Sequence, residues 1–597
     1  MSKILAIDDP AKTEPKNETE QENVLLMKDS KDPHSKNIAL YVTNLNVTSN
    51  KGKSILKNIN MEARFGEITA LMGPSGSGKT SLLRFLADLR SSNLTYEGKK
   101  YLIGHFKYVS QEDHLHGFLT VDKYMNNIFG LNYGFVNSIN FEERDKIKNS
   151  ILSEMQLLKT KQTKVGDIFI HGLSGGEKRR LSMALELISK PMLLILDEPT
   201  SGLDSFAAEK VMESLKDFVR KENIAVILTI HQPSSRIFKM IDRLILLKEG
   251  EIFYHDVCPK LNSFYELNNE RMWENYNPAD QCLEILAAKE DVKKQQYSLT
   301  SSNEEMSNLQ VTTKENEVKR KHLFKPANIV EKFIFLSYRN LKNIFLNPLV
   351  LGVRIAMYIM LCFMVGAIFW DLGSSFNHGS IISRSSVLFY VDAFLVFMSI
   401  AALPAFMMER AIIEKEINNK LYHPILYQLS NWITSFVGIV IITIISTLLV
   451  VLMCNLNNFG IFFVDLFLSL LIAEGLASLC SILVPHYIIG MALIAGLYGM
   501  FMLCEGFLIV KDDIPPWFIW GYYLAFHTYT FRVFMFIEFD PIQSFSNSNF
   551  KSGKEVLEFY GMGDVNVGHE LLILMGYVLG IQLLISLVMI LKYRKKK

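Results

Sequence analysis

The sequence has no clustered cysteine motif, no excess of charge and no hydrophobic start, and each absence argues against a class of protein. None of the six cysteines belongs to a C-x-x-C pair, so neither a zinc site nor a disulfide scaffold is indicated. The net charge is +1, which gives no sign of a nucleic-acid partner. Residues 1–23 are polar and acidic, without the hydrophobic stretch of a signal peptide.

Charge and hydrophobicity are unevenly distributed along the 597 residues. Charged residues crowd the first 345 positions, and long apolar runs occupy the rest. The chain is too long for one hydrophobic core, and a mean hydropathy of +0.18 is high for a soluble protein. We therefore expect a soluble N-terminal part followed by a membrane-embedded part.

Composition divides the chain into five segments. Residues 1–36 are predicted to be a disordered cytoplasmic tail, because they are rich in charge and almost free of aromatic residues. Residues 37–285 alternate strand-like apolar runs with helix-length segments, which is typical of an α/β domain. A flexible linker is predicted over 286–325 and an amphipathic connecting helix over 326–346. Residues 347–597 then form the membrane domain.

Six apolar runs in the C-terminal part are long enough to cross a bilayer, because about 20 residues span about 30 Å of hydrocarbon. Buried core helices could imitate one such run, but not six in succession. An even number of spans puts both termini on one side, and the basic tail 592–597 predicts that this side is cytoplasmic. The predicted spans are 349–370, 387–408, 432–454, 460–484, 487–510 and 570–591.

Residues 511–536 are too polar to span a membrane and too apolar for a free loop. We expect a re-entrant or interfacial element here, followed by a short external loop over 538–568. The aromatic residues expected at headgroup level are Trp517, Trp520, Tyr522 and Tyr523.

A glycine-rich string at 73–80, GPSGSGKT, fits G-x-x-x-x-G-K-[ST] and follows the strand-like run 67–72. Its glycines let backbone N–H groups close around phosphate oxygens, and the next helix points its positive end at them. Lys79 can reach the β- and γ-phosphates and Thr80 can ligate Mg²⁺. The alternative is a glycine-rich turn without a ligand. The predicted nucleotide contacts are Gly73, Pro74, Ser75, Gly76, Ser77, Gly78, Lys79, Thr80 and Ser81.

Two adjacent carboxylates, Asp197 and Glu198, end the apolar run 193–196. Buried unpaired charges are costly, and a metal-bound nucleotide would explain their presence. Asp197 is predicted to hold Mg²⁺ through water, and Glu198 to polarise the attacking water as general base.

Three further residues are placed to contact the same site, and each has a plainer structural alternative. Gln111, where the run ending YVSQ stops, is expected to contact Mg²⁺ or the attacking water and to report the nucleotide state to a neighbouring domain. Asp204 in SGLD is expected near the nucleotide. His231, after the run 224–230, is expected at the γ-phosphate. An isolated Gln would be a surface turn residue, and a lone His after a strand is more often structural.

The string LSGGEKRR at 173–180 predicts a second phosphate-binding turn at a helix start, made by Ser174, Gly175, Gly176 and Glu177. A chain with one P-loop already holds its phosphates. A second anion site makes sense if it completes the P-loop of another copy, so a dimer is expected. Both motifs are intact, which favours a homodimer over a heterodimer.

Taken in order, these motifs resemble the ATP-binding cassette family. The cassette comes first and the membrane domain second, and residues 37–597 are similar to the G (White) subfamily of half-transporters. The strings that carry this likeness are IHQPSSRIF (230–238), NPAD (277–280), ERAIIEKE (409–416) and GFLIVKDDIPPWFIWGYYLAF (506–526). The fold class implied is an α/β P-loop NTPase cassette followed by an all-α six-helix transmembrane domain.

The resemblance implies that two cassettes dimerise head to tail, with each ATP and its Mg²⁺ between the P-loop of one chain and residues 174–177 of the other. The connecting helix and the loop 409–420 would couple the cassettes to the membrane domain. The cassette is expected in the cytoplasm, because that is where ATP is found. The membrane domain would lie in the plasma membrane or in an internal membrane. The chain departs from some relatives, because 538–568 contain no cysteine and no N-x-[ST] sequon, and Tyr41 is only a weak candidate for stacking on adenine.

The leading interpretation is a dimeric ATP-driven exporter or translocator of a hydrophobic or amphipathic substrate, such as a lipid, a sterol or a xenobiotic. A nucleotide-gated channel or regulator is the alternative, although intact Glu198 and His231 favour turnover. The spans exclude a soluble cassette ATPase, and nothing in the chain suggests the docking site of an importer.

The resemblance also implies a substrate slot on the dimer axis, between the second and fifth spans and beneath an apolar plug. The alternative for the residues named next is ordinary helix packing or contact with lipid. Phe394 and Phe397 would face Met502, and Phe507 and Leu508 would form the plug. The intramembrane acids Asp392, Glu474 and Glu505 are further candidates, because burying a charge is expensive. The alternative for Asp392 and Glu505 is a position near a span end, and the alternative for Glu474 is a bond to a neighbouring helix.

Overall fold

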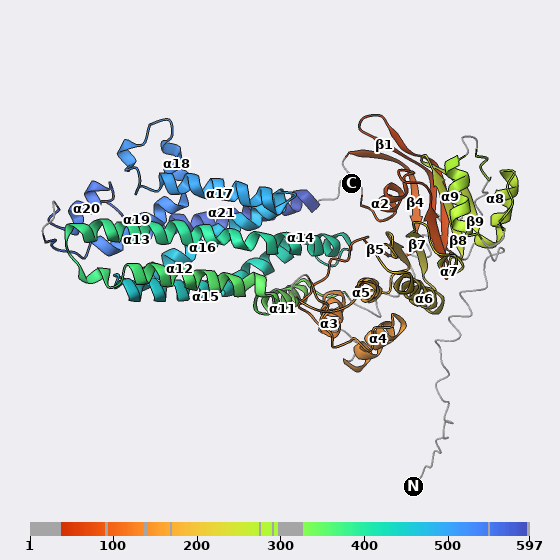
Figure 1. Ribbon diagram of the computed structural model, residues 1–597, viewed down its shortest axis with the longest axis horizontal. Coiled ribbons are helices and arrows are strands. Elements are labelled where there is room, and N and C mark those ends of the chain that lie inside the picture. Colours follow the sequence, from red (N-terminus) through yellow and green to blue (C-terminus); the bar gives the residue numbers. More distant parts are fainter. Residues whose placement is uncertain are drawn as a thin grey trace, which may run out of the picture.

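The structure is a computed structural model that describes residues 37–89, 93–135, 141–167, 170–273, 276–288, 292–295, 326–546 and 550–593. A strand-containing cassette and a long helical domain meet at helix α11 (Ile329–Leu346) (Figure 1). The predicted tail 1–36, nearly all of the predicted linker 286–325 and the last four basic residues lie outside the described residues.

The cassette contains two sheets. The smaller has the order β2 (Ser54–Arg64), β1 (Ile38–Ser49), β4 (Leu94–Leu102) and is antiparallel. The larger has the order β5 (Phe106–Val109), β6 (Leu193–Leu196), β7 (Ala225–Thr229), β3 (Ile68–Met72), β8 (Arg243–Lys248), β9 (Glu251–Val257). Its first five strands are parallel, and every residue of β3, β6 and β7 is buried, as expected of central strands covered on both faces. The α/β cassette predicted from the sequence is confirmed.

Side-chain caps fix where several cassette helices begin. Thr120, Ser174, Asp204 and Ser234 each accept a backbone N–H from the first turn of the helix that follows. The helices are α2 (Lys79–Leu86), α3 (Val121–Tyr133), α4 (Phe141–Glu154), α5 (Gly175–Leu187), α6 (Ser205–Glu222), α7 (Ser235–Phe238), α8 (Leu261–Leu267) and α9 (Pro278–Ala288).

The second domain is all helical. After α11 come α12 (Val353–Ile368), α13 (His378–Phe397), α14 (Leu403–Asn418), α15 (Pro424–Cys454), α16 (Phe459–Leu483), α17 (Tyr487–Cys504), α18 (Ile519–Leu524), α19 (Phe526–Phe539), α20 (Gly553–Phe559) and α21 (Val567–Tyr593). Among the described segments, six are long and apolar enough to cross a membrane, as predicted: Val350–Ser374, His378–Asn418, Pro424–Cys454, Phe459–Leu483, Tyr487–Cys504 and Val567–Tyr593.

The second, third and fifth of these spans differ most in extent from the prediction. The third begins at Pro424 rather than at residue 432. The second continues to Asn418, because α14 follows α13 through a single 3₁₀ turn, and its far end reaches the cassette (Figure 1). The fifth ends at Cys504 rather than at residue 510, since Gly506 (φ 103°) adopts a left-handed conformation and turns the chain.

The segment 511–536 folds back into the bundle. Helix α19 packs against α13, α16 and α21 and is buried along most of its length. Trp517, Trp520 and Tyr523 are exposed as expected, whereas Tyr522 is 2% exposed and packs against Gly506, so the expectation for this tyrosine is wrong. The predicted external loop 538–568 contains a short helix, α20.

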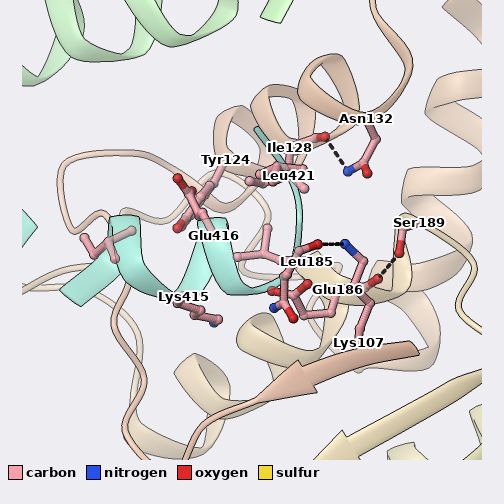
Figure 2. Close-up of a pocket in the computed structure, with 12 residues that line it drawn as sticks. Lys107, Tyr124, Ile128, Asn132, Leu185, Glu186, Ser189, Lys415, Glu416 and Leu421 are labelled. Carbon is pink, nitrogen blue, oxygen red and sulfur yellow. Dashed lines mark hydrogen bonds between the residues drawn. The ribbon is translucent and has the colours of Figure 1, made fainter. Parts of the chain in front are cut away.

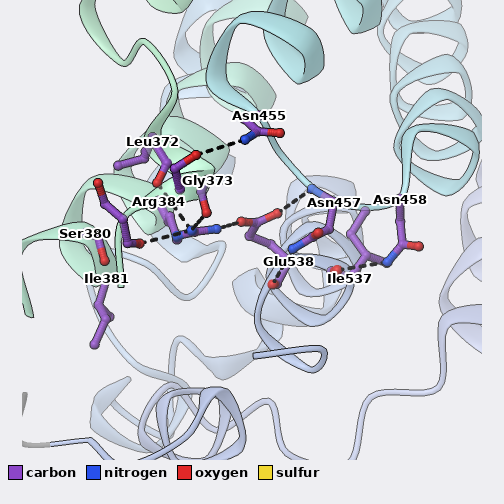
Figure 3. A network of polar contacts seen from close by, with 12 residues as sticks. Leu372, Gly373, Ser380, Ile381, Arg384, Asn455, Asn457, Asn458, Ile537 and Glu538 are labelled. Carbon is purple, nitrogen blue, oxygen red and sulfur yellow. Dashed lines mark hydrogen bonds and ion pairs between the residues drawn. The ribbon is translucent and has the colours of Figure 1, made fainter. Parts of the chain in front are cut away.

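A buried arginine fastens the end of the bundle that lies away from the cassette (Figures 1 and 3). Arg384 donates to the carbonyl of Gly373 (2.6 Å) and to the carboxylate of Glu538, which also accepts the backbone N–H of Asn457 (2.8 Å). The contacts join the α12–α13 connection, the α15–α16 connection and α19. Because both charged side chains are buried, these hydrogen bonds are needed to offset their desolvation.

Candidate functional site

The P-loop runs from the end of β3 to the start of α2. A Cβ atom at Gly73 would lie 2.0 Å from the carbonyl oxygen of Leu247, so only glycine fits there. The Lys79 ammonium donates to the carbonyls of Gly73 and Pro74, at 2.8 Å each. Burial lowers the pKa of Lys79, and the nearby carboxylates of Glu198 and Asp197 oppose that shift. The ammonium therefore lies inside the loop, within electrostatic reach of both acids.

Hydrogen bonds orient the two carboxylates at the end of β6. Asp197 accepts the hydroxyl of Thr229 at Oδ1 (2.8 Å) and that of Tyr108 at Oδ2 (3.2 Å). Glu198 accepts the side-chain amide of Gln111 (2.8 Å), and its own N–H donates to the Thr229 hydroxyl (2.9 Å). The carboxyl ends of β5, β6 and β7 thus bring Gln111, Asp197 and Glu198 together. Neither acid forms a salt bridge within the part of the chain that the structure describes.

Asp204 and His231 are not hydrogen-bonded to this group of side chains. Asp204 is the N-cap of α6 and accepts the backbone N–H of Ala207 (2.9 Å). The imidazole of His231 follows β7, is exposed and makes no hydrogen bond to any described residue. Within one chain, neither side chain joins the cluster around Glu198.

The turn 174–177 begins α5 and faces solvent at Ser174 and Gly175. The N–H and the hydroxyl of Ser174 both donate to the Glu177 carboxylate, at 2.9 Å each, and Ser174 Oγ accepts the Glu177 N–H (3.4 Å). This capping box shapes the turn. It occupies the Glu177 carboxylate and leaves the exposed N-terminus of α5 available to an anion.

Arg179 lies beside the cluster around Glu198, and the motifs did not single it out. It is buried and donates to the carbonyls of Ser110 (2.5 Å) and Asp197 (2.7 Å) and to the carboxylate of Asp113 (3.0 Å). It therefore links α5 to the segments that carry Gln111, Asp197 and Glu198. Helical spacing could have found it, because it lies three residues after the buried Gly176 and four before the buried Met183.

Two family models match the chain in the predicted order: "ABC transporter" over residues 56–201 and "ABC-2 type transporter" over residues 331–539. The chain is 28% identical over 528 residues to ABC transporter G family member 1 of Petunia hybrida, with 82% of each protein covered. It is 29% identical over 567 residues to ABC transporter G family member 5 of Arabidopsis thaliana, with 88% of this chain and 84% of that protein covered. The chain belongs to the G subfamily of ATP-binding cassette half-transporters.

The half-transporter is thus an ATPase coupled to membrane transport and an integral multi-pass membrane protein. A solved ATP-binding cassette, described as a dimeric post-hydrolysis state bound to ADP and phosphate, is 26% identical to it. That likeness covers 36% of this chain and 98% of the other, with a TM-score of 0.30.

The membrane domain of the half-transporter contacts the cassette through α14 and α11. A cavity of about 20 Å³ lies at this contact, with Lys107 and Glu186 of the cassette facing Lys415 and Glu416 of α14 (Figure 2). Burial lowers the pKa of Lys107 and raises that of Glu186. The Lys415 ammonium donates to the hydroxyl of Ser182 in α5 (2.6 Å), so α14 is joined directly to the helix that begins with the turn 174–177.

The residues predicted for the substrate slot lie in α13, in α17 and just after α17. Phe394 is 37% exposed and stacks on Tyr390 (4.2 Å between ring centroids), and Leu508 is 54% exposed. Phe397 and Met502 are half-buried. Phe507 packs on Phe389 of α13 (4.7 Å between centroids).

The intramembrane acids have different surroundings. Glu474 forms an ion pair with Arg354 of α12 (2.7 Å), which is the bond to a neighbouring helix left open above. Asp392 is buried and accepts the hydroxyl of Ser469 (3.4 Å), and Glu505 is fully buried at the end of α17. Tyr41 is 2% exposed in β1, against Tyr101, so the expectation that it could stack on adenine is wrong.

Replacing Arg179 with Leu should destabilise the cassette by about 3 kcal/mol, because the Asp113 carboxylate and several carbonyls lose a buried charged donor. Thermal unfolding of the purified protein measures this. Lys178→Leu, one residue earlier in the same helix turn, is the matched control and should change the transition little. Equal transitions for the two variants would contradict the structural role of Arg179.

Proposed function

We propose that the half-transporter works as a dimer that exports or translocates a hydrophobic or amphipathic molecule, such as a lipid, a sterol or a xenobiotic. The observation that carries this is the joint placement of Gln111, Asp197 and Glu198 beside the P-loop lysine in a chain with six apolar spans. A site able to hydrolyse ATP supplies the free energy, and the membrane domain offers an apolar path.

The donors at this site suit Mg²⁺, which prefers oxygen ligands from carboxylates, hydroxyls and substrate phosphates. Thr80, Gln111 and Asp197 are the residues proposed to hold it, and when bound the ion neutralises charge on the phosphates. The loop 73–81 surrounds the phosphates, with the backbone N–H groups of its residues other than Pro74 as donors and Lys79 as a fixed positive charge.

Glu198 is the proposed general base, which accepts a proton from the water that attacks the γ-phosphate. The Gln111 amide holds this carboxylate (2.8 Å), so a shift of Gln111 displaces the base. His231 is exposed on the same side of the sheet and is proposed to reach the γ-phosphate once the two cassettes close.

A second chain completes each site in this proposal. The exposed turn of Ser174, Gly175, Gly176 and Glu177, with Asp204 beside it, contacts the ATP held by the P-loop of the partner. Phe206, which follows this turn region in α6, is 71% exposed and offers an apolar contact for the same interface. Because each chain carries one P-loop and one turn 174–177, a homodimer has two complete sites. A heterodimer is the other outcome of the test below.

The substrate slot is proposed between α13 and α17 of both chains, lined by Phe394, Phe397 and Met502 and closed by Phe507 and Leu508. Aromatic faces and a flexible methionine make an adaptable apolar slot that suits flat hydrophobic molecules better than sugars or ions. The cassette and both termini are proposed to be cytoplasmic, in a plasma or an internal membrane.

The Glu198→Gln variant should bind Mg-ATP but hydrolyse it at least about 100-fold more slowly, because the amide cannot accept the proton of the attacking water. Steady-state phosphate release from the purified protein measures the rate, and nucleotide trapping measures binding. Glu222→Gln, at an exposed position in α6, is the control and should keep the normal rate. Near-normal hydrolysis by Glu198→Gln would overturn the role of this residue as general base. Nucleotide trapping without substrate transport by the wild-type protein would favour a gated channel.

The mass of the active particle tests the dimer. We expect the reconstituted ATPase to contain two copies of this chain and to lose activity on dilution to monomers, because a lone chain lacks the second phosphate-binding turn. Mass photometry combined with ATPase assays measures both. An active monomer would contradict the model, and activity that appears only with a different second chain would replace the homodimer by a heterodimer.

The Phe397→Ala variant should lose substrate stimulation of its ATPase, because the slot loses an aromatic wall. The ratio of stimulated to unstimulated rate within each variant is measured against a panel of lipids, sterols and amphipathic drugs. In Phe397→Ala this ratio should fall to about one. Phe459→Ala, an exposed phenylalanine at the start of α16, is the control. An unchanged ratio in Phe397→Ala would place the slot elsewhere.

A further inference from the structure

The outer edge of strand β5 is paired by a side chain from the membrane domain. β5 is the terminal strand of the six-stranded sheet, so one of its edges has no neighbouring strand among the residues that the structure describes. At this edge the carboxamide of Asn419 accepts the N–H of Tyr108 (3.0 Å) and donates to the Tyr108 carbonyl (2.9 Å). Asn419 thereby makes the pair of hydrogen bonds that a residue of an adjacent strand would make.

Asn419 is held rigidly at the C-terminus of α14. Lys420 (φ 58°) adopts a left-handed conformation, and the N–H groups of Leu421 and Lys420 return to the carbonyls of Glu416 (3.0 Å) and Ile417 (2.9 Å). This is a Schellman end, which satisfies the last carbonyls of the helix. The Lys107 ammonium also donates to the Asn419 carbonyl (2.7 Å). The position of the helix end therefore sets the position of Tyr108.

The side chain of Tyr108 leads from this edge to the active site. Its hydroxyl donates to Asp197 Oδ2 (3.2 Å), while Thr229 holds the other carboxylate oxygen (2.8 Å). Each oxygen of Asp197 is thus fixed by one hydroxyl.

We propose that Tyr108 is a positioning residue for the Asp197 carboxylate and that Asn419 of the membrane domain sets where Tyr108 stands. Movement of the α14 end then changes the orientation of Asp197 through Asn419 and Tyr108 alone. This route differs from the Gln111–Glu198 contact, which acts on the base rather than on the metal-holding acid. The inference rests on the role proposed above for Asp197.

The Tyr108→Phe variant removes only the hydroxyl. We expect the free Mg²⁺ concentration for half-maximal ATPase, at saturating ATP in the reconstituted full-length protein, to rise about tenfold, as for the loss of groups that orient metal ligands. Tyr133→Phe is the matched control. It removes a hydroxyl in the same cassette that donates to the Ile188 carbonyl (2.9 Å), away from Asp197, and should leave the Mg²⁺ dependence unchanged.

Asn419→Ala should raise the half-saturating Mg²⁺ concentration in the same direction, although Asn419 lies outside the nucleotide site. The neighbouring Asn418→Ala, whose side chain has no hydrogen bond to a described residue, should not. In the double variant Tyr108→Phe, Asn419→Ala the shift should not exceed that of Tyr108→Phe alone, because both changes break one route. Fully additive shifts, or no shift in Asn419→Ala, would overturn the route from α14.

Asp197→Asn separates this inference from the proposed function. Normal Mg²⁺ dependence in Asp197→Asn would remove the metal role of Asp197 itself. An inactive Asp197→Asn beside a Tyr108→Phe protein with wild-type Mg²⁺ dependence would overturn only the positioning role of Tyr108. If Tyr108→Phe fails to fold, the comparison of Asn419→Ala with Asn418→Ala decides the route.

Discussion

The buried ion pair between Arg339 of α11 and Glu416 of α14 (2.7 Å) holds together the two helices through which the membrane domain meets the cassette. Arg339 is 1% exposed, and Glu416 also accepts the hydroxyl of Tyr422 (2.5 Å). Desolvating two charges costs several kcal/mol per ion, so the pair persists only with good geometry and further hydrogen bonds. Loss of either partner would leave a buried charge at the junction of the two domains.

Several contacts depend on this junction. On the α11 side, the Glu331 carboxylate accepts the N–H of Phe135 (2.9 Å), and the ring of Phe335 covers Gly130 of α3, which has no room for a Cβ atom. The Lys332 ammonium donates to the Leu421 carbonyl (2.7 Å), so α11 also holds the chain beyond α14. The cassette therefore contacts a pair of helices that are joined to each other by a buried ion pair.

In the proposed mechanism, the sheet links this contact to the site of ATP hydrolysis. In a parallel sheet the carboxyl ends of the strands lie at one edge, which is where β5, β6 and β7 deliver Gln111, Asp197 and Thr229. α14 meets the same sheet at β5, its terminal strand, and at Ser182 of α5. A rigid sheet edge and a rigid helix end can transmit small displacements without a flexible intermediate.

The sequence by itself determined the fold class, the order of the domains and the number of spans, because a P-loop between strand and helix and runs of about 20 apolar residues are local patterns. It also indicated which residue types gather at the strand ends. Only the tertiary structure decided that Arg179 joins α5 to Asp197, that Asn419 pairs with β5, that Tyr522 and Tyr41 are buried and that Glu474 meets Arg354. The contacts join residues from different elements, and the burial of the two tyrosines depends on tertiary packing. Spacing along the sequence can indicate that a residue such as Arg179 faces inward, but it does not say which residue it meets there.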